Sequence, residues 1–252
     1  MSQESVTNPS PENIRIVLVE TSHPGNIGAA ARAMKTMGLS RLHLVNPAAF
    51  PHAEATARAS GADDILGNAR VCESLDEALA GCRLVVGASA RLRSLPMPVE
   101  KPRQTGARVV AEAGMGPVAV VFGREDAGLN NAELERCHYL MNIPTAPDFG
   151  SLNLGAAVQV AAYEIRVAME ERPPAVPRAE KQLASADDIG RFYDHLERTL
   201  VHIGFLNPDN PGKVMPKLKR MFNRIRPTRN EVSILRGILS AVDGFGGRDR
   251  GR

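Results

Sequence analysis

Three polar, glycine-containing segments hold the side chains best suited to chemistry, and each lies where an apolar stretch gives way to a helical pattern. They contain Asn26 and Arg32, then Glu125, then Ser151 and Asn153. Arginine, carboxylate, hydroxyl and amide groups can orient a substrate and stabilise charge that develops during a reaction. None of the segments has the spacing of a metal site, a hydrolase nucleophile or a P-loop. No sequence feature therefore calls for a metal ion.

The first segment follows an apolar run, and its small residues 28–31 would permit close approach of a ligand to the backbone. On the residues alone it could be the turn of a dinucleotide-binding enzyme, with Asn26 capping the next helix. However, it lacks G-x-G-x-x-G spacing, and no acidic residue follows the second predicted strand where a ribose would require one. We therefore disfavour a nicotinamide-dependent oxidoreductase. For Arg32, the alternative to a catalytic role is an ordinary ion pair with a surface acid.

Glu125 and Ser151 each admit a structural interpretation beside a functional one. A glutamate at the end of a buried strand is costly to bury without partners, so Glu125 should receive hydrogen bonds. It could equally lie at a helix N-terminus, where negative charge is stabilised. Ser151 stands immediately before an alanine-rich apolar run, and we expect it to cap a long helix over residues 152–170.

Short β-branched runs alternate with helical patterns from residue 14 to residue 171. This alternation predicts an α/β domain with a parallel sheet and helices on both faces. The run at residues 118–122 is apolar without alternation, as expected of a strand buried on both sides. The predicted strands cover residues 14–19, 42–45, 69–72, 84–87, 118–122 and 139–143, and the predicted helices cover residues 28–37, 54–60, 75–80, 103–113, 131–137 and 152–170.

Composition indicates a cytoplasmic protein. Hydrophobic residues make up 43% of the 252 residues, which is enough for a packed core. No apolar run approaches the roughly 18 residues that a membrane-spanning helix needs. The first residues are polar and lack the apolar segment of a secretion signal. The three cysteines are scattered, with no CxxC pair.

Positive charge is concentrated toward the C-terminus. Residues 1–170 carry 15 Lys and Arg against 18 Asp and Glu, whereas residues 171–252 carry 16 against 10. This concentration fits a polyanionic partner, because neutralisation of phosphates supplies most sequence-independent affinity for nucleic acid. A solvated helix face is the alternative. The candidate RNA-binding residues are Lys213, Lys217, Lys219, Arg220 and Arg224.

Three prolines within residues 171–180 predict a stiff linker and a domain boundary. Beyond them the pattern is helical, and residues 228–231 form a capping-box pattern that opens a last helix. The expected parts of the chain are a flexible N-terminus (1–13), a catalytic domain (14–171), a linker (172–186), a helical basic extension (187–243) and a disordered tail (244–252).

Taken in order, the three segments resemble the three motifs of the SpoU/TrmH-type branch of the SPOUT (trefoil-knot) RNA ribose methyltransferases. Motif one opens with Asn-x-x-x-x-x-Arg, matched by Asn26 and Arg32. Motif three is an Ile-Pro…Ser-Leu-Asn pattern followed by small residues, matched between positions 143 and 157. Motif two has the form Gly-x-Glu-x-x-Gly-Leu, matched by Gly123, Glu125, Gly128 and Leu129.

The resemblance implies a deep C-terminal trefoil knot in the α/β domain, with S-adenosylmethionine (SAM) as methyl donor. Members of this branch act as homodimers, with the site near the subunit interface. The residues that the resemblance assigns to catalysis are Arg32, Asn26, Glu125, Ser151 and Asn153. The residues that it places against SAM, on three loops that meet in the knot, are Ala88, Ser89, Ala90, Gly123, Ile143, Gly150, Ser151 and Leu152.

The basic extension resembles that of tRNA-acting members of this branch between residues 192 and 237. This implies methylation of the ribose 2′-hydroxyl of cytidine or uridine at nucleotide 32 of the tRNA anticodon loop. One alternative is a ribosomal-RNA methyltransferase of the same branch, which the extension disfavours. The other is an RNA-binding protein of this fold that has lost catalysis, which the retained motif residues disfavour.

The identity of the proton acceptor stays open at this point. Guanidinium rarely deprotonates in proteins, so we expect Arg32 to bind the adjacent phosphate and to stabilise the incipient alkoxide. A phosphate oxygen or water would then take the proton. The loop residue His23 is the alternative base, because imidazole titrates near neutral pH.

Overall fold

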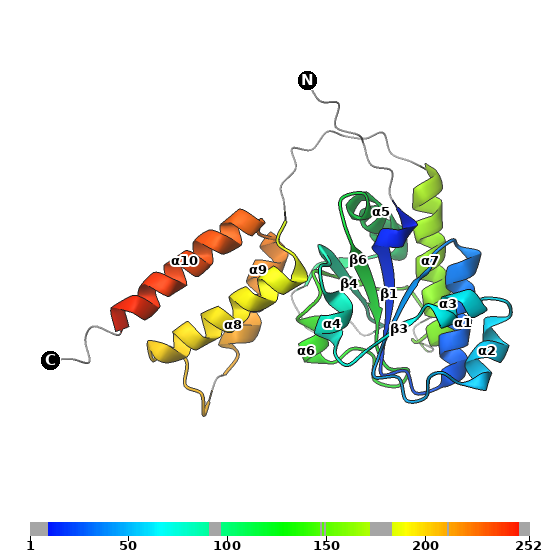
Figure 1. The fold of residues 1–252 in the computed structure, drawn as a ribbon, viewed down its shortest axis with the longest axis horizontal. Coiled ribbons are helices and arrows are strands. Elements are labelled where there is room, and N and C mark those ends of the chain that lie inside the picture. The colour runs from blue at the N-terminus through cyan, green and yellow to red at the C-terminus, as the bar shows by residue number, and fades with distance from the viewer. Residues whose placement is uncertain are drawn as a thin grey trace, which may run out of the picture. The chain divides into compact units, whose positions relative to one another are not determined.

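The computed structural model describes residues 10–90, 97–146, 148, 150–171, 183–210 and 212–246 of the chain. These residues form two compact units whose boundary falls between positions 177 and 178. Figure 1 shows that helices surround a sheet in the first unit, whereas the second unit consists of packed helices. Each unit is described by itself.

The first unit contains a parallel sheet with the strand order β3-β2-β1-β6-β4-β7-β5. Its strands are β1 (Ile14–Val19), β2 (Arg41–Val45), β3 (Arg70–Cys72), β4 (Leu84–Ala88), β5 (Val99–Glu100), β6 (Val118–Phe122) and β7 (Tyr139–Met141). Every residue of β6 is buried, which confirms the prediction of a strand covered on both faces. Because β7 lies between the earlier strands β4 and β5, the order agrees with the threaded topology that the resemblance implies.

Helices cover both faces of this sheet (Figure 1). They are α1 (Pro24–Thr36), α2 (Ala53–Ala59), α3 (Asp63–Gly67), α4 (Leu75–Leu79), α5 (Pro102–Ala113), α6 (Asn131–Leu134) and α7 (Leu154–Glu171). Helix α7 packs against both α1 and α5. Gly106 permits the close approach of α5, because a Cβ atom there would lie 2.6 Å from the carbonyl oxygen of Glu164. The predicted fold class, a parallel α/β sheet with helices on both faces, is confirmed.

The differences from the predicted elements have local causes. Helix α3, of five residues, and strand β5, of two residues, were not predicted. The strand predicted at 139–143 ends at Met141. Residues 11–13, expected to be flexible, form a short 3₁₀ turn that is held by a 2.8 Å hydrogen bond from Asn13 Nδ2 to the carbonyl oxygen of Ala113.

The second unit consists of α8 (Ala186–His202), α9 (Val214–Ile225) and α10 (Arg229–Gly246) around a small apolar core. The rings of Phe192 and Phe222 meet edge to face, with centroids 4.8 Å apart. The buried Tyr193 hydroxyl donates to Asn223 Oδ1 at 2.6 Å, so α8 and α9 share a polar contact within the core. The predicted capping box is present, since Thr228 N–H donates to Glu231 Oε2 at 2.7 Å and Glu231 N–H donates to Thr228 Oγ1 at 3.2 Å.

The edges of this unit differ from the expected linker and tail. Residues 183–186 belong to the helical unit, because Leu183 pairs with Thr228 and the Ser185 side chain caps α8. Helix α10 runs to Gly246, past the expected end at 243. Residues 172–182 of the predicted linker, 1–9 of the N-terminus and 247–252 of the tail lie outside the described residues. None of the described helices is long and apolar enough to span a membrane.

Candidate active site

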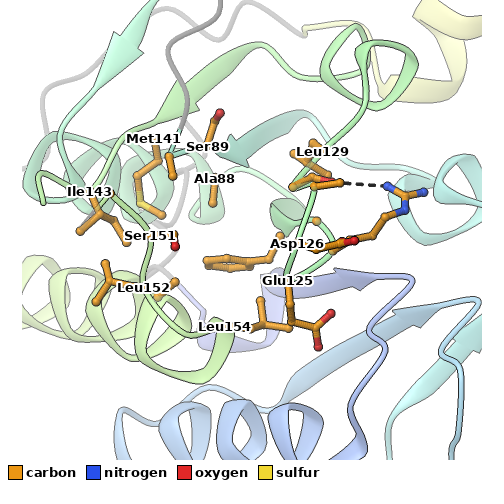
Figure 2. Close-up of a pocket in the computed structure, with 18 of the residues that line it drawn as sticks. Ala88, Ser89, Glu125, Asp126, Leu129, Met141, Ile143, Ser151, Leu152 and Leu154 are labelled. Carbon is orange, nitrogen blue, oxygen red and sulfur yellow. Dashed lines mark hydrogen bonds between the residues drawn. The ribbon is translucent and has the colours of Figure 1, made fainter. Parts of the chain in front are cut away.

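A pocket opens at the edge of the sheet where β4, β6 and β7 end (Figure 2). The figure shows Ile143, Ser151 and Leu152 on one side of it and Glu125 and Asp126 on the other. The eight residues predicted to contact SAM all line this pocket: Ala88, Ser89, Ala90, Gly123, Ile143, Gly150, Ser151 and Leu152. The three predicted loops therefore converge, while the contact with SAM itself stays a prediction.

Sequence reasoning did not assign every residue of the lining. The further residues that line the pocket include Phe122, Arg124, Asp126, Met141 and Thr145. Arg124 and Asp126 offered a signal, because they lie inside motif two. Phe122 and Met141 line the pocket because they are the last residues of β6 and β7, and Thr145 lies on the segment after β7; no local sequence pattern indicates these positions.

The turn after β6 folds back on itself at Gly123. A Cβ atom at this position would lie 2.2 Å from the carbonyl carbon of Gly128, so only glycine fits. Gly128 has a φ of +69°, in the left-handed region that favours glycine, and its N–H donates to the carbonyl oxygen of Arg124 at 2.9 Å. Glycines at both ends of the turn thus fix the backbone that carries Glu125.

The carboxylate of Glu125 accepts hydrogen bonds from the segment between β1 and the first turn of α1. Ser22 donates through its N–H and its hydroxyl, both at 3.1 Å, and His23 N–H donates at 3.3 Å. Asn26 Nδ2 donates to Glu125 Oε1 at 2.8 Å. The expectation that Glu125 receives hydrogen bonds is confirmed, and these bonds hold motif one against motif two.

Asn26 also joins motif one to motif three. Its Oδ1 accepts a 2.9 Å hydrogen bond from Asn153 Nδ2, and Asn153 Oδ1 accepts one of 2.9 Å from the N–H of Gly155. The helices can meet here because Gly155 has no side chain; a Cβ atom would lie 2.6 Å from Cβ of Ala29. Glu125, Asn26 and Asn153 therefore form one continuous hydrogen-bonded line across the three motifs.

The predicted helix caps were wrong at both Asn26 and Ser151. Helix α1 begins at Pro24 and its N-cap is His23, whose Nδ1 accepts from Gly25 N–H at 3.2 Å. Helix α7 begins at Leu154, and Asn153 occupies the capping position through its bond with Gly155. Asn26 and Ser151 are consequently available for other contacts: Asn26 bonds to Glu125 and Asn153, and Ser151 lines the pocket.

The pKa of Glu125 lies below the ordinary glutamate value. Partial burial by itself would raise the pKa, but the hydrogen bonds from the Asn26 side chain and from the backbone N–H groups of Ser22 and His23 together outweigh burial. Glu125 is thus an anion at neutral pH. It accepts hydrogen bonds and orients its neighbours, and it has no proton to donate.

Arg32 lies on the exposed surface of α1 and is not part of the pocket lining. Its guanidinium makes no hydrogen bond or ion pair with any other residue that the structure describes. The surface ion pair considered from the sequence is therefore not formed within the described part of the chain. The cation is left available to an external anion, and its place beside the acceptor ribose stays a prediction.

The geometry of His23 disfavours it as the base. Its Nδ1 lone pair already accepts from Gly25 N–H, so the neutral ring carries its proton on Nε2. Nε2 lies 3.8 Å from a carboxylate oxygen of Glu54. The neutral imidazole therefore has no unoccupied nitrogen lone pair with which to take a proton from a substrate.

The candidate RNA-binding residues all lie on or next to α9 in the second unit. Lys213 directly precedes the helix, and Lys217 and Arg224 are exposed on it. Lys219 and Arg220 are half-buried, and Arg220 Nε donates to the carbonyl oxygen of Pro216 at 2.9 Å. The basic cluster that the sequence predicted is thus a feature of a single amphipathic helix.

Family models match both units of the chain. Residues 13–163 match the SpoU rRNA Methylase family, and residues 187–251 match the C-terminal domain of the tRNA methyltransferase TrmJ. The chain belongs to the SpoU methylase family. It is therefore a methyltransferase, and the resemblance seen in the three motifs is confirmed.

Known relatives support this membership over nearly the whole chain. The tRNA (cytidine/uridine-2′-O-)-methyltransferase TrmJ of Klebsiella pneumoniae is 55% identical over 236 residues, which cover 92% of this chain and 97% of that protein. The crystal structure of TrmJ from Z. mobilis is similar with a TM-score of 0.81 and 32% identity, covering 91% of this chain and 98% of that one. A probable methylase family protein from Haemophilus influenzae gives a TM-score of 0.62 at 47% identity, covering 93% and 97%.

We expect the substitution Glu125→Gln to lower the melting temperature most at neutral pH. Glutamine keeps one acceptor but places an NH₂ group either against the two Ser22 donors that meet Oε2 or against the His23 and Asn26 donors that meet Oε1. Because the folded-state pKa of Glu125 is lowered, its stabilisation is complete above the ordinary value of 4.5 and is lost as the pH falls through the lower folded value. The difference in melting temperature between Glu125→Gln and the unsubstituted protein should therefore shrink in acid.

Thermal melting followed by circular dichroism, from about pH 7 down to about pH 3, measures this difference. The matched control is Asp126→Asn, because the neighbouring Asp126 is exposed and has no hydrogen bond with another described residue. A difference that stays constant across the pH range would contradict the role of the ionised Glu125 carboxylate.

Proposed function

We propose that this protein is a SAM-dependent tRNA ribose methyltransferase that acts on the 2′-hydroxyl of cytidine or uridine at nucleotide 32 of the anticodon loop. The observation that carries the proposal is the convergence of the three motifs at one pocket, joined by the line Glu125–Asn26–Asn153. The substrate class is supported by the name of the Klebsiella pneumoniae relative, a tRNA (cytidine/uridine-2′-O-)-methyltransferase. The choice of nucleotide 32 is what the family resemblance implies.

The pocket lining fits SAM chemically. Apolar side chains such as Phe122, Leu129 and Leu152 suit the adenine ring, while small residues at 88–90 leave backbone groups within reach of polar atoms. The exposed carboxylate of Asp126 suits a ligand that carries positive charge. When bound, SAM supplies an electrophilic methyl group.

The task of the protein is to align the acceptor ribose hydroxyl with the methyl–sulfur bond. Orientation of this kind can lower a barrier by about 7–11 kcal/mol. The fixed line Glu125–Asn26–Asn153 holds its amide groups in one orientation beside the pocket, and Ser151 adds a hydroxyl to the lining. Arg32 would bind the adjacent phosphate and stabilise the 2′-oxygen as its proton leaves to a phosphate oxygen or water.

The tRNA would be bound mainly by the basic residues of α9. Phosphate contacts by Lys and Arg supply sequence-independent affinity. Aromatic residues make up only 4% of the chain, so base stacking has few side chains to use. The anticodon loop suits such an enzyme, because unpaired nucleotides expose their ribose groups.

We also infer that the protein works as a homodimer in the cytoplasm, as the family resemblance implies. Leu152 and Tyr163 are 40% and 53% exposed. A second subunit could cover such apolar surface. A site near the subunit interface would suit Arg32, whose side chain is exposed on α1.

Incubation of the purified protein with SAM and unmodified tRNA should yield 2′-O-methylation at nucleotide 32. Mass spectrometry of nuclease fragments locates the modified nucleotide, and ribosomal RNA serves as the competing substrate. Methylation of ribosomal RNA in place of tRNA would instead support the ribosomal alternative. Methylation of neither RNA would overturn the proposed activity.

The substitution Arg32→Ala should lower the single-turnover rate of methyl transfer by about 100-fold, because it removes a cation aimed at developing negative charge. SAM affinity, measured by titration calorimetry, should change little, since Arg32 lies outside the pocket lining. Arg103→Ala is the control, because Arg103 is 70% exposed on α5 and pairs with Glu171. Equal losses of rate and SAM affinity in Arg32→Ala would reject the role.

Replacement of Lys217, Lys219 and Arg220 together by Ala should raise the tRNA KM and flatten its salt dependence. Each lost phosphate contact reduces the slope of log K against log salt by about 0.7–0.9. The control with equal charge loss replaces Arg41, Arg70 and Arg103, which are exposed on the first unit. Circular dichroism verifies folding, and unchanged tRNA binding would count against α9 as the RNA-binding element.

A further inference from the structure

Arg124, the residue between Gly123 and Glu125 in the pocket turn, is held by two carboxylates from different parts of the chain. Its Nε donates to Glu20 Oε2 at 2.8 Å. Its two terminal nitrogens donate to the two oxygens of Glu133, at 3.0 and 2.9 Å. All three guanidinium nitrogens therefore donate, and the contact with Glu133 has the two-pronged geometry that arginine, but not lysine, can form.

Each partner of Arg124 makes a further hydrogen bond of its own, although the Glu20 side chain is 47% exposed. Glu133 is 9% exposed and takes part in a capping box at the start of α6, in which Asn130 N–H donates to its carboxylate at 2.8 Å and its own N–H donates to Asn130 Oδ1 at 3.0 Å. Glu20 follows the last residue of β1 and has a φ of +48°, a left-handed conformation that is uncommon outside glycine. Its N–H donates to the carbonyl oxygen of Val45 at 2.8 Å.

Arg124 thus joins three structural elements at the pocket: the end of β1, the start of α6 and the turn that it belongs to. It also donates to the carbonyl oxygen of Gly128 at 3.4 Å, across the mouth of that turn. The turn supplies pocket lining from Gly123 to Leu129, and it carries the Glu125 carboxylate that gathers Ser22, His23 and Asn26.

We propose that Arg124 is a positioning residue for the methyl-donor pocket, which fixes the turn 123–129 between Glu20 and Glu133 and thereby sets the backbone against which SAM binds. The inference rests on the proposed function, because SAM is taken as the ligand of this pocket. Arg124 acts through the turn and through Glu125. A lysine keeps the charge but cannot span both carboxylates and the Gly128 carbonyl, so it should leave the turn less ordered.

A purely structural ion pair would stabilise the fold without affecting the ligand. The chain offers a matched control in Arg83 and Glu112, whose side chains are 16% and 13% exposed, against 21% and 11% for Arg124 and Glu133. Arg83 Nε donates to Glu112 at 2.9 Å, and Arg83 also donates to a backbone carbonyl, that of Met115, at 3.1 Å. Neither residue of this pair lines the pocket.

The test compares Arg124→Lys with Arg83→Lys in the full chain. Thermal melting should show a similar loss of stability in both variants. Titration calorimetry should show SAM binding weakened by about 10-fold in Arg124→Lys and by less than about 2-fold in Arg83→Lys. Glu20→Gln, which weakens the contact at Nε alone, should cause a smaller loss, about 3-fold, and provides a milder variant should Arg124→Lys not fold.

Glu133→Gln completes the comparison, because glutamine can retain the capping box while it removes the charge. The double variant Arg124→Lys with Glu133→Gln should bind SAM no more weakly than the weaker-binding single variant, since both changes break the same contact. SAM affinity that is unchanged in Arg124→Lys, or reduced equally in Arg83→Lys, would overturn the positioning role alone. Absence of SAM binding by the unsubstituted protein would instead overturn the proposed function and this inference with it.

Discussion

A partly buried carboxylate needs hydrogen-bond donors, and Glu125 finds them in a segment about a hundred positions earlier in the chain, at Ser22, His23 and Asn26. These hydrogen bonds affect both Glu125 and the segment that donates to it. They keep Glu125 ionised, and the anion in turn fixes the segment that leads into α1. Because an ionised acceptor forms stronger hydrogen bonds than a neutral one, this carboxylate determines which way the Asn26 amide faces. Asn26 then presents its oxygen to Asn153, and the third motif is held as well.

The sheet makes this contact possible by bringing strand ends together. In a parallel sheet all carboxyl ends lie at the same edge, so loops far apart in sequence meet there. Glycine residues allow the backbone segments around the site to approach one another closely. Gly123 allows its turn to fold back within a distance that no Cβ atom could tolerate, and Gly155 lets α7 approach Ala29 of α1. At both positions a side chain would prevent the close backbone contact that the site requires.

The two units differ in the range of the interactions that their described residues can make. In the first unit, directional hydrogen bonds fix the backbone and side chains around the pocket. A displacement of about one ångström there would change how a bound ligand is oriented. In the second, a helix with an apolar side packed on α8 carries cations on its remaining surface. Attraction between cations and phosphates is tolerant of geometry and sensitive to salt. Under the proposed function, the second unit would attract the polyanionic substrate and the first would orient it.

Local patterns in the sequence determined most of the helices and strands, and the resemblance of the three motifs supplied the candidate site residues. The strands at residues 14–19 and 118–122 match their predictions residue for residue, because β-branched and other apolar residues dominate both segments, without a break at 118–122 and with Arg15 as the one exception at 14–19. The family resemblance of the three motifs named Asn26, Glu125 and Asn153, and the structure brings all three together. Tertiary structure alone decided their partners. Asn26 and Ser151 were expected as caps, but His23 and Asn153 take those positions. The position of Arg124 inside motif two did not indicate its contact with Glu20, which lies 104 residues away in the sequence. Hydrogen bonds between distant segments depend on how strands are ordered in the sheet, and a helix or strand pattern contains no record of that order.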